Sequence, residues 1–145
     1  MTISRRPSPL GLSIALLGLI VVLTPNVLLP VCEGLLELAS GKRVPMRCFW
    51  TGRAEMVMGG LILVAGLTMA LIHSDEGRRR LSHQVAFLGL ATVLIPLYII
   101  PTCDHPDMAC NVGTKPALLL LGAFTLALGL WGSRAPRPSP AVPAA

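Results

Sequence analysis

The chain has 145 residues, of which 53% are hydrophobic and 13% are charged, whereas an ordinary soluble domain is roughly 25% charged. Its mean hydropathy is +0.71, and the charges cluster between long apolar stretches that contain almost none. A soluble core cannot account for this pattern, so the composition excludes a soluble domain. We expect a membrane protein that contacts the lipid bilayer and has no nucleic-acid partner.

Four stretches are long enough to cross a hydrocarbon layer of roughly 30 Å, which takes about 20 helical residues. They cover approximately residues 10–31, 54–72, 81–101 and 116–132, and the only charged side chain in them is Glu55, near the start of the second. Backbone groups in lipid must find partners within the chain, so apolar spans of this length form helices. The sequence predicts an all-α integral membrane protein, a bundle of four transmembrane helices.

The flanks of these spans indicate how the chain is oriented. Residues 1–9 form a short basic lead, residues 10–132 the membrane domain, and residues 133–145 a tail rich in proline and alanine that is expected to be disordered. Lysine and arginine favour the cytoplasmic side. Seven flank the spans on the side of the termini and five on the other: Arg5, Arg6, Arg78, Arg79, Arg80, Arg134 and Arg137 against Lys42, Arg43, Arg47, Arg53 and Lys115. Both termini are therefore expected in the cytoplasm.

An internal repeat divides the membrane domain into two halves. Leu, Pro, Pro and Cys recur at a constant offset of 71, as Leu23, Pro25, Pro30 and Cys32 and as Leu94, Pro96, Pro101 and Cys103. A Met-x-Cys motif follows at an offset of 62, as Met46 and Cys48 and as Met108 and Cys110, so the first loop is nine residues longer. The repeat predicts two tandem helical hairpins, residues 10–72 and 81–132, related by a pseudo-two-fold axis along the membrane normal.

Several local features follow from this layout. Proline removes a helix hydrogen bond and kinks the helix, so kinks are expected at the four repeated prolines. Thr51 is a candidate N-cap of the second helix, which would place Glu55 in its first turns, near the positive end of the helix dipole. Small residues spaced by four predict close helix contacts, at Gly11 and Ala15, Gly66 and Ala70, and Ala123 and Ala127.

The four cysteines fall together on the outer side, which fits an oxidising compartment. Two pairings treat the two halves alike. One forms a disulfide within each hairpin, Cys32 with Cys48 and Cys103 with Cys110; the other crosses between hairpins and joins Cys32 to Cys103 and Cys48 to Cys110. We favour the first pairing, since a bridge that closes a loop of about 15 residues stabilises by roughly 3 kcal/mol.

Two other interpretations of the cysteines stay open. A cysteine pair in each of two outer loops resembles the layout of quinone-linked enzymes that regenerate disulfides in bacteria, with Arg47 placed to activate Cys48, although no Cys-x-x-Cys motif is present. The alternative is a Cu(I) site, because thiol, thioether and imidazole groups suit that soft ion. Its ligands would come from Met46, Cys103, His105, Met108 and Cys110.

The chain resembles the bacterial membrane-protein family catalogued as domain of unknown function 4418. The resemblance rests on the segment Pro45-Met46-Arg47-Cys48-Phe49-Trp50-Thr51-Gly52-Arg53-Ala54-Glu55, read with Pro101-x-Cys103 and Met108-x-Cys110-x-x-x-Thr114-x-Pro116. It implies a multi-pass protein of the bacterial cytoplasmic (inner) membrane. It also implies an accessory role beside ABC exporters whose permease carries a large outer domain, and it assigns no catalytic residue.

Catalysis has little support in the sequence. There is no glycine-rich phosphate loop and no Ser/His/Asp set, and the spans hold no chain of acids for a proton relay. The apparent absence of a buried charge argues against an ion-coupled transporter. The sequence therefore favours a non-catalytic protein without a cofactor, whose disulfide-braced outer loops dock a membrane-protein partner. A thiol-disulfide oxidoreductase is the principal alternative.

Overall fold

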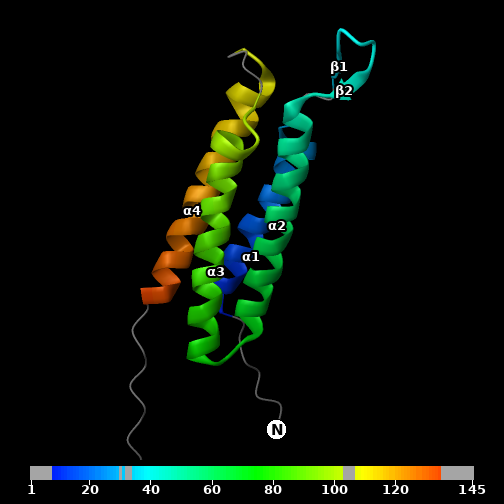
Figure 1. The fold of residues 1–145 in the computed structure, drawn as a ribbon. Coiled ribbons are helices and arrows are strands. Elements are labelled where there is room, and N and C mark those ends of the chain that lie inside the picture. The colour runs from blue at the N-terminus through cyan, green and yellow to red at the C-terminus, as the bar shows by residue number, and fades with distance from the viewer. Residues whose placement is uncertain (1–7, 30, 32–33, 103–106, 135–145) are drawn as a thin grey trace, which may run out of the picture.

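The computed structural model describes residues 8–29, 31, 34–102 and 107–134. These residues contain four helices that are long and apolar enough to cross a membrane, so the chain is a multi-pass membrane protein. Their α-helical parts are α1 (Pro9–Leu23), α2 (Arg47–Leu71), α3 (Asp75–Leu94) and α4 (Lys115–Arg134). Helix α1 begins and α4 ends at one end of the bundle, here called the terminus end (Figure 1). The opposite end, here called the cysteine end, carries Cys48 and Cys110.

Helices α2 and α3 begin earlier in the chain than the sequence predicts. Helix α2 begins at Arg47 rather than near Ala54, and its N-cap is Met46, so the prediction of Thr51 as N-cap is wrong. Helix α3 begins at Asp75, which leaves only residues 72–74 between α2 and α3. Polar ends can extend a membrane helix beyond the lipid, and acidic residues in the first turn of α3 favour its start there. Hydrophobicity alone therefore underestimates both helices.

A small β-hairpin, which the sequence analysis treats as loop, projects beyond the helices at the cysteine end (Figure 1). Strands β1 (Leu35–Glu37) and β2 (Arg43–Pro45) pair in antiparallel fashion. Gly41 in the turn has a φ of 75°, a conformation that glycine adopts without strain. Arg43 Nε donates to Glu37 Oε1 at 2.8 Å across the pair. The extra length of the first loop therefore forms an ordered, exposed structure.

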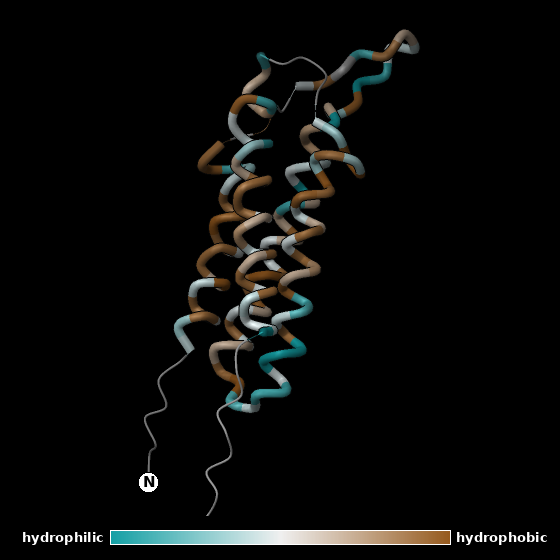
Figure 2. Tube along the Cα trace, turned by 90° about the vertical axis from the view of Figure 1, so that its left-hand side faces the viewer, coloured by the Kyte–Doolittle hydropathy of each residue, from teal (hydrophilic) through white to brown (hydrophobic). Residues whose placement is uncertain are grey.

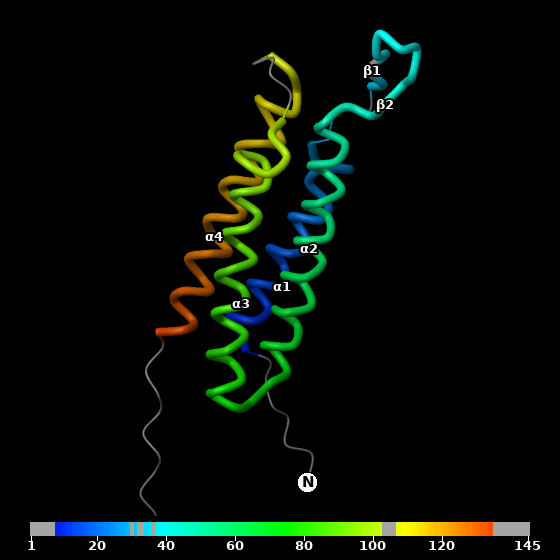
Figure 3. Tube along the Cα trace, in the orientation of Figure 1, coloured from blue at the N-terminus to red at the C-terminus, as the bar shows by residue number. Residues whose placement is uncertain are grey.

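The helices pack as two close pairs, α1 with α2 and α3 with α4 (Figure 3). Glycines permit the close approach. A Cβ atom on Gly66 would lie 2.4 Å from the backbone N of Ala15, and one on Gly129 would lie 2.5 Å from the backbone N of Ala86. No real Cβ atom tolerates such a distance, so only glycine fits there. Ala123, expected at such a contact, is exposed instead.

Proline marks the cysteine-end turn of two helices. The π-helical turns η1 (Thr24–Leu28) and η2 (Ile95–Ile99) continue α1 and α3, with Pro25 and Pro96 as their second residues. A proline cannot donate the usual helix hydrogen bond, and a wider turn accommodates the missing donor. Pro101 follows η2, while Pro30 lies outside the described residues.

The interior between the two pairs is narrow. Ile14, Ile62, Met69 and Val85, contributed by α1, α2 and α3, form a buried cluster in the half nearer the terminus end. Large apolar side chains such as Leu16, Val57 and Phe124 are exposed on the outside of the bundle. Figure 2 shows hydrophobic residues along much of the length of the helices. A bilayer would cover this surface, so the structure fits a protein surrounded by lipid.

Candidate functional site

At the cysteine end, Cys48 of α2 and Cys110 lie at the interface between the two helix pairs. Both side chains are fully buried, and their Sγ atoms are 3.2 Å apart. Cys110 begins η3 (Cys110–Thr114), a π-helical turn that leads into α4. Their predicted partners Cys32 and Cys103 lie outside the described residues. The structure thus brings together the two equivalent cysteines of the sequence motif.

One turn deeper, two threonines join the pairs by reciprocal hydrogen bonds. Thr51 of α2 donates its hydroxyl to the carbonyl of Ile100, and Thr114 donates its hydroxyl to the carbonyl of Leu29, both at 2.9 Å. Each threonine is buried, and each accepting carbonyl follows a proline-containing π-turn. These carbonyls lie at the ends of helices, where no further helical N–H is available. The bonds therefore fix one helix pair against the other at this end.

The residues expected to bind a soft metal are only partly described. Met46 and Met108 are half-buried at the cysteine end, while Cys103 and His105 lie outside the described residues. Within the described ranges, no group of three or more His, Cys, Asp or Glu side chains is placed to hold a metal ion.

Glu55 is the residue whose position differs most from the expectation. It lies more than two turns into α2 rather than at its start, and its side chain is 0% exposed. Neither carboxylate oxygen has a hydrogen-bond partner in the described part of the chain. The expectation that the spans bury no ionisable side chain is therefore wrong.

A spacing in the sequence could have revealed this burial. Cys48, Glu55, Ile62 and Met69 recur every seven residues, and in the structure all four are buried on one face of α2. A seven-residue step returns to the same face of a helix after about two turns. The same reasoning on α3 would have found Thr92, seven residues after Val85. Thr92 is 0% exposed, and its hydroxyl also lacks a partner among the described residues.

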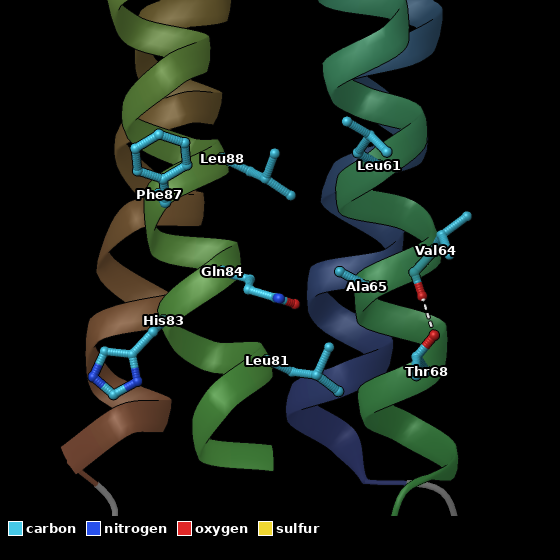
Figure 4. Close-up of a pocket in the computed structure, with 9 residues that line it drawn as sticks. All are labelled: Leu61, Val64, Ala65, Thr68, Leu81, His83, Gln84, Phe87 and Leu88. Atoms are coloured by element: carbon cyan, nitrogen blue, oxygen red, sulfur yellow. Dashed lines mark hydrogen bonds between the residues drawn. The ribbon is translucent and has the colours of Figure 1, made fainter. Parts of the chain in front are cut away.

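On the outside of the bundle, an open groove of about 560 Å³ runs between α2 and α3. Figure 4 shows its lining: Leu61, Val64, Ala65 and Thr68 from α2, and Leu81, His83, Gln84, Phe87 and Leu88 from α3. The Thr68 hydroxyl bonds to the Val64 carbonyl of its own helix at 2.7 Å and so is not available to a ligand. The groove is mainly apolar and open to the lipid, so it offers no cluster of reactive groups.

Comparison with known proteins places the chain in a family. The model of the family described as Domain of unknown function (DUF4418) matches residues 14–133. The chain belongs to this family. The match covers the four helices, the β-hairpin and the cysteine end, so it confirms the resemblance seen in the sequence motifs. Neither a curated protein nor a solved structure matches the chain.

Proposed function

We propose that this chain is a non-catalytic accessory membrane protein whose cysteine end docks a membrane-protein partner. The observation that carries this proposal is the β1–β2 hairpin, which projects beyond the helices (Figure 1). Its apolar side chains Leu35, Leu38 and Val44 are 56%, 48% and 38% exposed. Exposed apolar side chains on a segment that projects from the bundle support a protein interface there. The sequence resemblance makes the permease of an ABC exporter the candidate partner.

A docking surface needs a rigid base, and the buried contacts beneath the hairpin support one. The Thr51 and Thr114 bonds cross between the helix pairs, and the buried cysteine contact lies beside them. We infer disulfides within each hairpin, Cys32 with Cys48 and Cys103 with Cys110. The 3.2 Å between Cys48 and Cys110 is a contact distance, longer than the roughly 2.05 Å of an S–S bond, and it favours this pairing over the crossed one.

We further infer that the two helix pairs are tandem repeats related by a pseudo-two-fold axis. The π-turns η1 and η2 begin at Thr24 and Ile95, at the offset of 71 found in the sequence. The accepting carbonyls of Leu29 and Ile100 share that offset. Gly18 and Gly89, again 71 apart, each approach the backbone of the neighbouring helix. These equivalent contacts support two copies of one hairpin.

The orientation proposed from the arginine and lysine distribution places the cysteine end outside the cytoplasmic membrane and both termini in the cytoplasm. Ser40 in the β-hairpin turn and Ser74 between α2 and α3 are both exposed, so each can be replaced by cysteine and labelled. We expect an impermeant thiol reagent added to intact cells to label Ser40→Cys and to spare Ser74→Cys. Labelling of Ser74→Cys without labelling of Ser40→Cys would show that the orientation is the opposite of the proposed one.

The docking proposal is tested by site-specific photo-crosslinking in native membranes. A photoreactive amino acid at Leu38 should crosslink to an ABC exporter permease, identified by mass spectrometry. The same probe at Leu71, exposed at the terminus end, is the matched control and should not yield that adduct. Replacing Leu35 and Val44 by serine should abolish the adduct from Leu38. Crosslinks to lipid alone, or equal crosslinking from both positions, would contradict the proposal.

The second candidate is a membrane thiol-disulfide oxidoreductase, favoured by the sulfur contact between Cys48 and Cys110. Exchange requires sulfur atoms to approach one another directly, and these two are already adjacent. Titration of the purified protein against glutathione buffers, followed by addition of quinone, separates the two functions. Structural disulfides resist reduction down to about −300 mV, whereas a catalytic pair would be reduced readily and reoxidised by quinone.

A further inference from the structure

The interior holds two buried polar side chains, Glu55 and Thr92, that the proposed docking function does not use. Each is 0% exposed. Among the described residues, their three side-chain oxygens are the only buried side-chain N or O atoms without a hydrogen-bond partner. Leaving a buried polar group without a hydrogen-bond partner destabilises the fold, and a charged group does so more strongly, so stability of the fold gives no reason for either residue.

The two residues lie in the same part of the bundle interior, the layer on the cysteine-end side of the core cluster. Ile62 of α2 and Val85 of α3 belong to one core cluster. Glu55 precedes Ile62 by seven residues and Thr92 follows Val85 by seven, and the two helices run in opposite directions (Figure 1). Both steps therefore lead about 10 Å toward the cysteine end on the inward face. Glu55 and Thr92 thus both lie in this layer, on opposite helix pairs, and no hydrogen bond joins them in the structure.

The other two helices supply apolar groups to this layer. Val21 lies seven residues beyond Ile14 on α1, Leu118 lies on α4, and their exposures are 0% and 1%. Under the proposed repeat, Val21 corresponds to Thr92, and Leu118 corresponds to Glu55. One member of each equivalent pair is apolar and the other is an unsatisfied polar group. The equivalent positions of the two halves are therefore all buried, but in each pair one side chain is polar and the other is apolar.

We propose that Glu55 is a proton-binding site in the membrane interior and that its protonated carboxyl group turns to donate to the Thr92 hydroxyl, a hydrogen bond that the structure itself does not contain. A buried carboxylate in lipid needs a positive charge beside it, and within the described ranges Glu55 forms no ion pair. A desolvated metal ion needs about six oxygen ligands, whereas this layer supplies one carboxyl group and one hydroxyl group beside two apolar side chains. A proton needs only the carboxylate, and the resulting carboxyl O–H can donate to the Thr92 hydroxyl.

Few other titratable groups face this layer. Among the described residues, Cys48 of α2 lies about two turns nearer the cysteine end, but it is disulfide-bonded and does not titrate. Cys110 lies at a similar distance before Leu118. Helix α1 contributes Val21, Thr24 and Pro25 at this depth, α3 contributes Thr92 and Pro96, and none of these titrates. Glu55 is therefore the only carboxyl group of the described residues that this interior encloses, and its protonation can be followed separately from the others.

The proposal is tested by infrared spectroscopy of the purified protein in lipid nanodiscs. At pH 7 we expect the carbonyl stretch of a protonated, unhydrated carboxylic acid, which Glu55→Gln removes and alkaline titration diminishes. Glu76→Gln, a change at an exposed glutamate, is the control and should leave the band intact. Absence of the band, or its persistence in Glu55→Gln, would overturn the proposal.

The role of Thr92 has its own matched pair of variants. Thr92→Val copies Val21 and should shift the carboxyl band to higher frequency, because the hydrogen bond to the carboxyl group is lost. Thr125→Val is the control: Thr125 is equally buried, but its hydroxyl already bonds to the Leu121 carbonyl at 2.8 Å. An unshifted band in Thr92→Val would remove Thr92 from the site. If Glu55→Gln fails to fold, Glu55→Asp replaces it and should move the band rather than abolish it.

Discussion

The two helix pairs of this protein agree where backbones touch and differ where side chains meet either water or the bundle interior. Gly66 with Ala15 and Gly129 with Ala86 make the same close contact, and a proline-containing π-turn occupies the same place in α1 and α3. Contacts at backbone distance tolerate no added atom, and both pairs contain them. The comparison teaches that the glycine contacts and the π-turns form a framework common to both pairs, whereas the side chains that face water or the interior differ between them.

Two of the differences concern chain length. The α1–α2 pair has nine more residues in its cysteine-end loop, and this longer loop contains the β1–β2 hairpin. The α3–α4 pair has one more residue between Cys110 and Thr114 than the α1–α2 pair has between Cys48 and Thr51. The wider π-helical turn η3 accommodates this extra residue. Thr114 can therefore bond to Leu29 as Thr51 bonds to Ile100. A local insertion is thus accommodated without losing the contact between the pairs.

The largest expected effect comes from copying the buried acid into the other pair. Leu118→Glu should destabilise the protein by about 3 kcal/mol, the scale of placing an acidic side chain at the centre of a membrane helix. Glu55→Leu should instead stabilise it by roughly 1–3 kcal/mol, because an unsatisfied buried group is removed. Unfolding free energies from steric trapping in bicelles measure both. Destabilisation by Glu55→Leu would show that the acid serves the fold.

The glycine contacts provide the next test of equivalence. Gly66→Ala and Gly129→Ala should each lower the unfolding free energy by about 1–3 kcal/mol, since the added methyl group forces the helices apart. Gly60→Ala is the matched control on α2: its Cβ meets nothing within 4 Å, so helix propensity should raise stability by up to about 1 kcal/mol. The same unfolding assay applies. A large effect at only one of the two contacts would mean that the pairs do not share a framework.

The threonine bonds should give a smaller, symmetric effect. Thr51→Val and Thr114→Val preserve shape and remove one hydroxyl each, so each should cost about 1 kcal/mol. The double variant should lose the sum or somewhat more, because both bonds join the same two bodies. Thermal unfolding in detergent, with Thr125→Val as the control, measures the difference. A loss of stability in only one of the two variants would show that a single threonine bond joins the helix pairs at the cysteine end.

The smallest effect is expected in the β-hairpin. Arg43→Ala removes the exposed ion pair with Glu37, and such pairs contribute about 0–1 kcal/mol in water and less in salt. The unfolding temperature of the bundle should therefore not change, at low or high salt. Because the hairpin projects from the bundle, the proposed function gives it a role in recognition and none in helix packing. A marked fall in bundle stability would show that the hairpin is part of the fold itself.

Much of the architecture could be predicted from the sequence for a simple reason. Length and hydrophobicity determine how many helices a membrane protein forms, because lipid satisfies no backbone group. The repeated prolines predicted local breaks in the helices, and Pro25 and Pro96 lie in π-helical turns. Gly66 and Ala70 predicted a close helix contact that the structure contains. Ala123 failed as a contact residue because small size is necessary for close packing but does not determine which face of a helix points inward.

The tertiary structure alone decided which polar groups are buried and what they meet. Cys48 and Cys110 are 62 residues apart in sequence, yet their sulfur atoms are in contact, since that distance depends on how the two pairs dock. Glu55 looked like a residue at the mouth of a helix until α2 proved to begin at Arg47. The seven-residue spacing of Cys48, Glu55, Ile62 and Met69 indicates the inward face of α2, but which groups from the other helices meet Glu55 there depends on how the two pairs pack. Composition and periodicity thus determined the number and kind of helices, while the packing of one pair against the other decided where the chemistry lies.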